Sequence, residues 1–145
     1  MEIDHIAIAV SSMDDALATF ERLYGITAEH TEDIASDKVS EAMLKVGNTY
    51  LQLLQPSDPE STVAKFIEKR GQGLHHIAIR VDDLESTLAH LKNEGAELLD
   101  EEPRIGGGGH RVAFVHPKTT NGILIELVEH TTTGDAVHRP AGSRD

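Results

Sequence analysis

The sequence contains no cysteine, and this absence excludes two kinds of scaffold and site. Neither a disulfide framework nor a thiolate-bound metal can form, so any metal ion must be held by nitrogen and oxygen ligands. No apolar run approaches the length needed to cross a membrane, and no signal peptide opens the chain. We therefore expect a soluble, cytoplasmic protein with no membrane partner.

Basic residues are also scarce. The chain has 13 Lys and Arg against 25 Asp and Glu, which gives a formal net charge of -12. This balance argues against a nucleic-acid partner. An anionic substrate would need local lysine or arginine residues to oppose the overall charge. With 145 residues the chain has the size of one ordinary domain, which can bury a core without cross-links.

The sequence does contain an internal repeat. Residues 3–10 read IDHIAIAV and residues 74–81 read LHHIAIRV, and each segment places a histidine, His5 or His76, at the start of an alternating apolar strand. A lone histidine at such a position is usually satisfied by a backbone carbonyl. Two histidines at matched positions favour a shared metal, because neutral imidazole is a common metal ligand. His75 is set aside because strand alternation points it to the opposite face.

A second matched pair follows the histidines. Gln52 lies 47 residues after His5 in the run TYLQLLQ, and Glu126 lies 50 residues after His76 in the run GILIELVE. A carboxylate among apolar neighbours is costly to bury unless it is paired or binds a metal. The alternative is a hydrogen-bonded interior side chain, and for Gln52 only the repeat favours ligation. If octahedral, a metal held by these four donors keeps two open positions, as a catalytic site does.

The two modules show the same order of predicted elements. In module one a strand leads to a helix capped by Ser11 or Ser12 and ended by Gly25, and then to a hairpin. A connector helix should begin at Asp58-Pro59-Glu60. In module two, Asp82 and Asp83 open the equivalent helix. The predicted hairpin strands are residues 39–46 and 49–54 in module one, and 111–115 and 123–128 in module two.

The pattern predicts an α+β fold in which two paired βαβββ modules form a curved, half-open barrel around a metal site. One domain would span residues 1–130, with module one at 1–56, a connector helix at 57–73 and module two at 74–130. Residues 131–145 lack apolar periodicity, and we expect them to form a flexible tail.

Glu41 is a candidate for proton transfer. On a hairpin folded at Gly47-Asn48, residues whose numbers sum to about 95 face one another, so Glu41 is opposite Leu54 and close to Gln52. The alternative is a solvent-facing glutamate. The glycine run at residues 106–109 either lets a ligand approach the backbone or is a flexible hairpin entry, and the lack of a following helix excludes a phosphate-binding loop.

Several segments together resemble a known family. They are DHIAIAV, VSEAMLKVG, LQLLQP, ESTVAKFIEKRGQGLHHIAIRVDDL and HRVAFVHPKTTNGILIEL, and they cover nearly all of the chain up to His130. They resemble the vicinal-oxygen-chelate (glyoxalase/bleomycin resistance/dioxygenase) superfamily and, within it, the methylmalonyl-CoA epimerases. The resemblance implies the interconversion of (2R)- and (2S)-methylmalonyl-CoA through an enolate, in a homodimer that binds a CoA thioester.

The resemblance also assigns residues. It implies that one divalent ion is bound by His5, Gln52, His76 and Glu126, with Co²⁺ favoured in vitro and Mn²⁺, Ni²⁺, Zn²⁺ or Mg²⁺ as alternatives. It places the acid/base on Glu41, with Glu126 as a possible second proton-transfer group. Three alternatives stay open: a glyoxalase I-like lyase, an extradiol dioxygenase and a metal-free binding protein of the same fold.

Overall fold

The computed structural model of the protein describes residues 1–131. Within them the chain forms two compact units, which we call the N-terminal unit (residues 5–75) and the C-terminal unit (residues 76–131 together with 1–4). The tail expected at residues 131–145 lies, apart from Thr131, outside the described residues. No helix among the described residues is long and apolar enough to cross a membrane.

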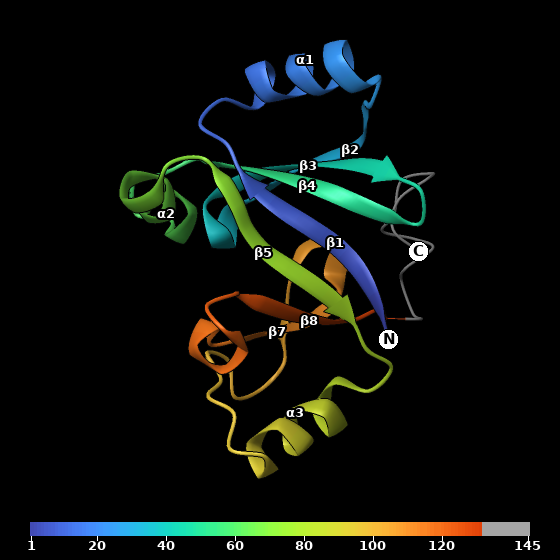
Figure 1. Cartoon of the computed structure of the whole chain (residues 1–145), viewed down its shortest axis with the longest axis vertical. Coiled ribbons are helices and arrows are strands. Elements are labelled where there is room, and N and C mark those ends of the chain that lie inside the picture. Colours follow the sequence, from blue (N-terminus) through green and yellow to red (C-terminus); the bar gives the residue numbers. More distant parts are fainter. Residues whose placement is uncertain (132–145) are drawn as a thin grey trace. The chain divides into compact units, whose positions relative to one another are not determined.

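The N-terminal unit has the strand order β2-β3-β4-β1. Strand β1 is parallel to β4, and β3 is antiparallel to both β2 and β4. Two helices belong to the same unit (Figure 1). In chain order the elements are β1 (Glu2–Ala9), α1 (Met13–Tyr24), β2 (Ala28–Ile34), a 3-10 turn (Ala35–Asp37), β3 (Val39–Val46), β4 (Thr49–Pro56) and α2 (Thr62–Arg70).

Helix α1 covers one face of this sheet. Its first turn is capped by Ser12, whose side chain accepts a hydrogen bond from the backbone of Asp15 at 3.2 Å, and it ends at Gly25 in the left-handed conformation. These caps are the ones expected from the sequence. The apolar side of α1 packs on a buried cluster of Val10, Ala42, Leu44 and Leu53. The sheet is therefore covered on this side, and its other face is left to carry polar residues.

Helix α2 covers part of that other face. Val63 is buried in a cluster with Ala7, Ala9, Val39 and Leu54, and Phe66 and Ile67 pack against it. The expected start of this helix was wrong. The Asp58 side chain accepts a hydrogen bond from the backbone of Glu60 at 2.7 Å, which closes a turn, and the helix begins at Thr62 after its cap, Ser61.

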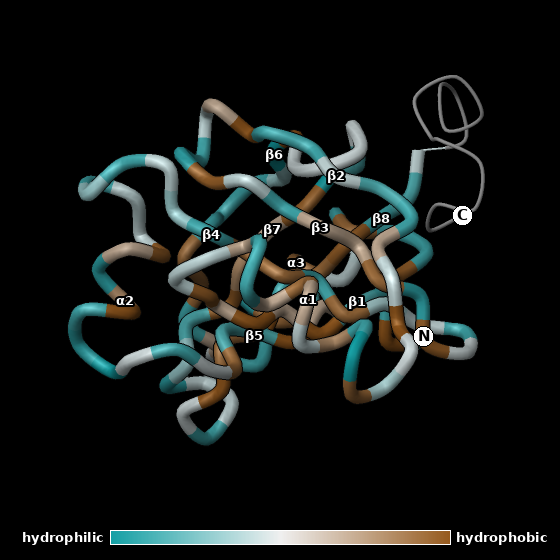
Figure 2. Tube along the Cα trace, turned by 90° about the horizontal axis from the view of Figure 1, so that it is seen from above, coloured by the Kyte–Doolittle hydropathy of each residue, from teal (hydrophilic) through white to brown (hydrophobic). Residues whose placement is uncertain are grey.

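Strand β2 is required by the βαβββ plan but was not located from the sequence. Its residues alternate between half-buried and exposed, and none is fully buried. Figure 2, coloured by hydropathy, shows hydrophilic residues along β2. An edge strand of this kind carries no apolar periodicity strong enough to reveal it.

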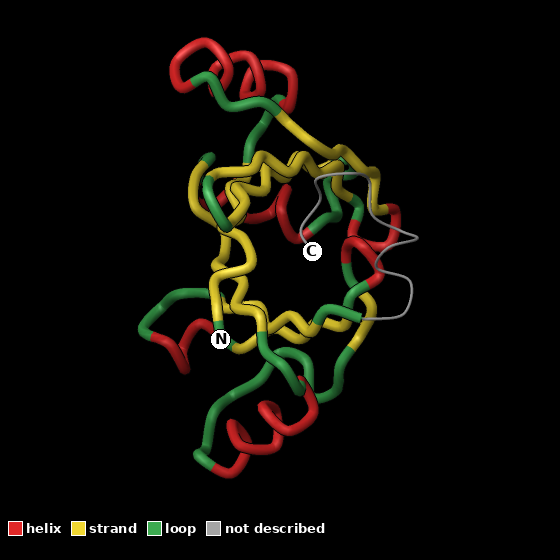
Figure 3. The backbone as a smooth tube through the Cα atoms, turned by 90° about the vertical axis from the view of Figure 1, so that its right-hand side faces the viewer, coloured by secondary structure: helices red, strands yellow, loops and turns green. Residues whose placement is uncertain are grey.

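The C-terminal unit repeats the arrangement with the strand order β5-β8-β7-β6. Strand β5 is parallel to β8, and β7 is antiparallel to β6 and β8. Helix α3 starts after Asp83, as expected, and its Leu84 and Leu88 are buried in an apolar cluster of the same unit. Figure 3 colours the backbone by secondary structure, with helices in red and strands in yellow. The elements are β5 (Gly73–Arg80), α3 (Leu84–Asn93), β6 (Arg104–Ile105), a 3-10 turn (Gly107–Gly109), β7 (Arg111–Val115), a 3-10 turn (Pro117–Thr120) and β8 (Ile125–Glu129).

The α+β fold of two βαβββ modules is confirmed in both units. The glycine run forms the turn between β6 and β7, where the backbone N–H of Gly106 donates to His110 at 2.8 Å. Gly106 is needed for packing, because a Cβ at this position would lie 2.9 Å from Cγ2 of buried Val112. The hairpin-entry interpretation of this run is therefore the one that the structure supports.

Candidate functional site

In the N-terminal unit, the parallel pairing of β1 with β4 places His5 and Gln52 on one face. His5 is opposite Tyr50 and Ala7 is opposite Gln52, so the two candidate ligands lie two positions apart on neighbouring strands. Both are buried, with 3% and 6% of their surface exposed. Ala7 is fully buried between them and leaves room for the larger side chains.

The C-terminal unit holds the equivalent pair. Ala78 is opposite Glu126 in the parallel pairing of β5 with β8, and His76 precedes Ala78 by two positions, as His5 precedes Ala7. Nε2 of His76 lies 3.1 Å from Oε1 of Glu126, and both residues are buried. The ring of Phe114 meets the His76 ring edge-on at 5.3 Å. The two candidate ligands of this unit are thus already oriented toward each other.

His75, which precedes His76, points elsewhere. Its ring contacts Phe66 of α2, with the ring centroids 4.9 Å apart. Successive residues of a strand point to opposite faces, so only one histidine of the pair can share a face with Glu126. The sequence-based choice of His76 over His75 is consistent with this geometry.

Glu41 lies beside Gln52, as the hairpin arithmetic predicted. It is opposite Leu54 in the pairing of β3 with β4, which puts its side chain on the face that carries Gln52. Nε2 of Gln52 donates a hydrogen bond to Oε1 of Glu41 at 2.5 Å. Glu41 is 1% exposed, so the solvent-facing alternative is wrong.

The hydrogen bond to Glu41 also fixes the orientation of the Gln52 amide. Because the amide nitrogen faces Glu41, the amide oxygen is the atom left for another partner. Oε1 of Gln52 is buried and has no hydrogen-bond partner among the described residues. Such an atom is costly to bury unless a ligand completes it.

The repeat duplicates the candidate ligands but not the candidate base. Met43 is opposite Gln52, and Phe114 is opposite Glu126, so the position equivalent to Glu41 in the C-terminal unit is Val112. Val112 is apolar and buried in a cluster with Ala78 and Val128. The repeat therefore places a carboxylate at this position in the N-terminal unit only.

The chain matches a protein-family model. The model of the glyoxalase/bleomycin resistance protein/dioxygenase superfamily matches residues 4–114. The chain belongs to this superfamily.

Several epimerases are similar to this chain over most of its length. The ethylmalonyl-CoA/methylmalonyl-CoA epimerase of Cereibacter sphaeroides is 36% identical over 127 residues, which are 86% of this chain and 95% of that protein. The human mitochondrial methylmalonyl-CoA epimerase is 35% identical over 126 residues, or 86% of this chain and 72% of that protein. A complex of Streptomyces coelicolor methylmalonyl-CoA epimerase with 2-nitronate-propionyl-CoA has a TM-score of 0.86 and 38% identity, and covers 91% of this chain and 96% of that one.

The donor set fits a divalent ion of the kind expected for this superfamily. It consists of two imidazoles, one amide oxygen and one carboxylate, which suit Co²⁺, Mn²⁺, Ni²⁺ or Zn²⁺. Two observations favour ligation. The buried amide oxygen of Gln52 lacks a hydrogen-bond partner among the described residues, and His76 closely approaches Glu126.

Two polar residues near Glu41 were not identified from the sequence. Glu32 is directly opposite Glu41 in the pairing of β2 with β3, and His30 lies two positions earlier on β2. Nε2 of His30 is 3.1 Å from Oε1 of Glu32. One ring nitrogen of His30 and one carboxylate oxygen from each glutamate lie within 4.8 Å of one another. Because β2 was not located from the sequence, only the spacing H-x-E could have indicated this cluster.

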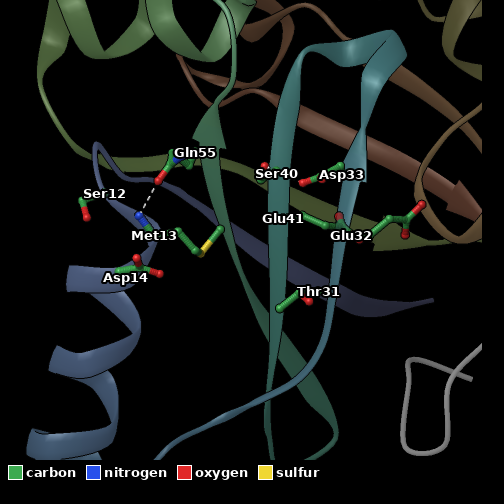
Figure 4. A pocket seen from close by; sticks show the side chains of 9 residues that line it. All are labelled: Ser12, Met13, Asp14, Thr31, Glu32, Asp33, Ser40, Glu41 and Gln55. Atoms are coloured by element: carbon green, nitrogen blue, oxygen red, sulfur yellow. Dashed lines mark hydrogen bonds between the residues drawn. The ribbon is translucent and has the colours of Figure 1, made fainter.

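A pocket of 370 Å³ lies beside the same strands. Figure 4 shows the start of α1 on one side and β2 and β3 on the other, with Glu41 and Glu32 next to each other. The backbone N–H of Met13 donates to Oε1 of Gln55 at 2.6 Å, which fixes α1 against β4. The pocket is lined by Ser12, Met13, Asp14, Thr31, Glu32, Asp33, Ser40, Glu41 and Gln55.

Two arginines of the C-terminal unit are engaged in ion pairs. Arg111 contacts Glu85 at 3.0 Å and Glu129 at 3.4 Å, and the hydrogen bond to Glu85 raises the pKa of its guanidinium. Arg104 lies 3.5 Å from Asp100 and over the ring of Phe114 at 5.5 Å.

Proposed function

We propose that this protein interconverts the 2R and 2S forms of methylmalonyl-CoA. Homologues and structural neighbours of the chain are methylmalonyl-CoA epimerases, and one neighbour is a complex with methylmalonyl-CoA itself. The observation that carries the proposal is the buried pair of Glu41 and Gln52. It combines a candidate base with a candidate metal ligand on one face of a sheet, as an epimerisation through an enolate requires.

The four donors of the repeat, His5, Gln52, His76 and Glu126, together bind one divalent ion in this proposal. Equivalent register positions and burial in each unit support the assignment. When bound, the ion supplies positive charge that stabilises negative charge on the substrate oxygens. Co²⁺ is the ion to load first, because imidazole, amide and carboxylate ligands accept it.

Glu41 removes the α-proton of one epimer. The C–H bond breaks, the proton passes to a carboxylate oxygen of Glu41, and the electron pair stays on the substrate as an enolate. Gln52 holds Oε1 of Glu41 through its amide N–H, which orients the carboxylate during transfer. Delivery of a proton to the opposite face of the planar enolate completes the epimerisation.

Glu126 is the candidate for the opposite face. It is the only carboxylate on β8 that is buried, and its Oε1 lies next to Nε2 of His76. Val112 occupies the position equivalent to Glu41 in the C-terminal unit, so a second glutamate base related by the repeat is excluded there. Proton transfer in the two directions therefore depends on different surroundings.

The test is proton NMR of (2R)- or (2S)-methylmalonyl-CoA in deuterium oxide, with Co²⁺-loaded and chelator-treated protein. We expect α-deuteration and appearance of the other epimer with the loaded protein alone. The absence of exchange with loaded, folded protein contradicts the epimerase, and a glutathione hemithioacetal is then the next substrate to test. Equal exchange after chelation contradicts the role of the metal.

We further propose that the protein acts in the cytoplasm as a homodimer. The homodimer is the assembly that the resemblance to the epimerase family implies. Light scattering during size-exclusion chromatography should give twice the chain mass of 15.8 kDa. A mass of one chain at micromolar concentration contradicts the dimer.

A further inference from the structure

Glu32 is directly opposite Glu41 on neighbouring antiparallel strands. Like charges at directly opposite positions repel, so such a pair is unfavourable unless something offsets it. His30 provides a hydrogen-bonding partner for Glu32, since its Nε2 lies 3.1 Å from Oε1 of Glu32. The three side chains form a cluster whose ligating atoms lie within 4.8 Å of one another, which one bridging water can span.

The cluster connects a buried group to the solvent. Glu41 is 1% exposed, whereas the side chains of Glu32 and His30 are 37% and 18% exposed. The side chain of Glu41 has no direct access to bulk water, whereas the side chain of Glu32 is partly exposed to it. Glu32 thus lies between the buried carboxylate and the solvent.

The arrangement is not a general requirement of the βαβββ module. In the C-terminal unit, Val112 occupies the position equivalent to Glu41. The residue opposite Val112 is Arg104, whereas the residue opposite Glu41 is Glu32. The second carboxylate is therefore found where the candidate base is found and is replaced by a cation where the base is absent.

We propose that Glu32, held by His30, exchanges the proton of Glu41 with the solvent between removal from the substrate and return. This inference rests on the proposed function. Glu41 passes its proton to the carboxylate of Glu32, directly or through one water. Glu32 releases this proton to solvent, takes up a solvent proton and passes that one back to Glu41, so that over the exchange and the return to substrate each carboxylate gains two protons and loses two. Glu32 acts through Glu41 and is a positioning and exchange residue.

The experiment uses Co²⁺-loaded protein and protonated substrate in deuterium oxide, stopped at low conversion. Mass spectrometry gives the deuterium content of the recovered substrate, and chiral analysis gives the amount of epimer formed. In the wild type, the proton on Glu41 is exchanged for deuterium before it returns to the substrate. The recovered starting epimer therefore carries deuterium. In Glu32→Gln the original proton returns, and the ratio of recovered-substrate deuterium to epimer formed falls about tenfold.

Three variants serve as controls. Glu29→Gln makes the same change on the exposed side of β2 and should keep the wild-type ratio. His30→Ala should lower the ratio, because Glu32 is no longer held, and His30→Gln should restore it by keeping a donor. An unchanged ratio in both Glu32→Gln and His30→Ala overturns the proposal, even if the turnover number falls.

The wild-type protein separates this proposal from the function on which it rests. A wild-type protein that forms no epimer overturns both. A wild-type protein that forms epimer, with variants that keep its deuterium ratio, overturns the exchange role of Glu32 and leaves the epimerase intact.

Discussion

Oδ1 of Asp4 lies 2.6 Å from Nε2 of His130, although 126 positions separate the two residues in the sequence. Both are buried, and the His130 ring stacks on the His110 ring with centroids 4.0 Å apart. Asp4 immediately precedes His5, the first candidate ligand. The first four residues of the chain belong to the C-terminal unit, which also contains His130.

Replacing Asp4 should therefore destabilise the fold. Asp4→Ala leaves Nε2 of His130 buried without its partner, and we expect the free energy of unfolding to fall by about 1–3 kcal/mol. Urea denaturation of the metal-free protein measures the loss. Glu2→Ala, at an exposed position of the same strand, is the control and should change stability by less than about 0.5 kcal/mol. A similar small effect for Asp4→Ala means that the contact does not stabilise the fold.

Glu41→Gln should separate metal binding from proton transfer. The variant keeps the size of the side chain but cannot accept a proton, so we expect epimerisation to fall by about 100-fold or more. Calorimetric titration with Co²⁺ should give nearly the wild-type affinity, because Glu41 is not among the proposed ligands and a glutamine oxygen can still accept the hydrogen bond from Gln52. A fully active variant rules out Glu41 as the base, and a variant that has lost its metal indicates a ligand instead.

Most of the candidate site could be predicted because the sequence contains an internal repeat. The equivalence of His5 with His76, and of Gln52 with Glu126, follows from counting along the repeat, and the register of both parallel strand pairs agrees with it. Glu41 followed from the tight turn at Gly47-Asn48, which fixes every pair of the hairpin.

What could not be predicted depends on exposed strands and on distant contacts. Glu32 and His30 lie on β2, an edge strand whose polar residues carry no hydrophobic signal. The pairing of Asp4 with His130 joins opposite ends of the described chain, and no local pattern indicates it. Asp58 looked like the start of a helix but closes a turn, because its side chain binds the backbone two residues ahead.

His76→Ala should remove the metal as well as the activity. A lost ligand should cost more than the roughly 10–100-fold in affinity that a lost outer-sphere partner costs. Calorimetry with Co²⁺ should give one ion per chain for the wild type. His30→Ala is the matched control, because His30 belongs to the other histidine and glutamate cluster. Loss of the ion in His30→Ala, with retention in His76→Ala, would move the metal to that cluster.

Gly106→Ala tests the packing of the turn between β6 and β7. The backbone of Gly106 has an ordinary negative φ of -112°, so alanine causes no backbone strain there. Its Cβ, however, would lie 2.9 Å from Cγ2 and 3.0 Å from Cγ1 of Val112, whose side chain is buried with Ala78 and Val128. We expect this overpacking to lower the free energy of unfolding by about 1–3 kcal/mol.

A double-mutant cycle assigns that loss to the contact with Val112. Val112→Ala removes both γ-carbons, so adding Gly106→Ala to it should cost nearly nothing, whereas the same change in the wild type has its full cost. Thermal or urea unfolding of the four proteins gives the interaction energy. If Gly106→Ala is equally costly in both backgrounds, the requirement for glycine comes from the turn itself and not from the Val112 side chain.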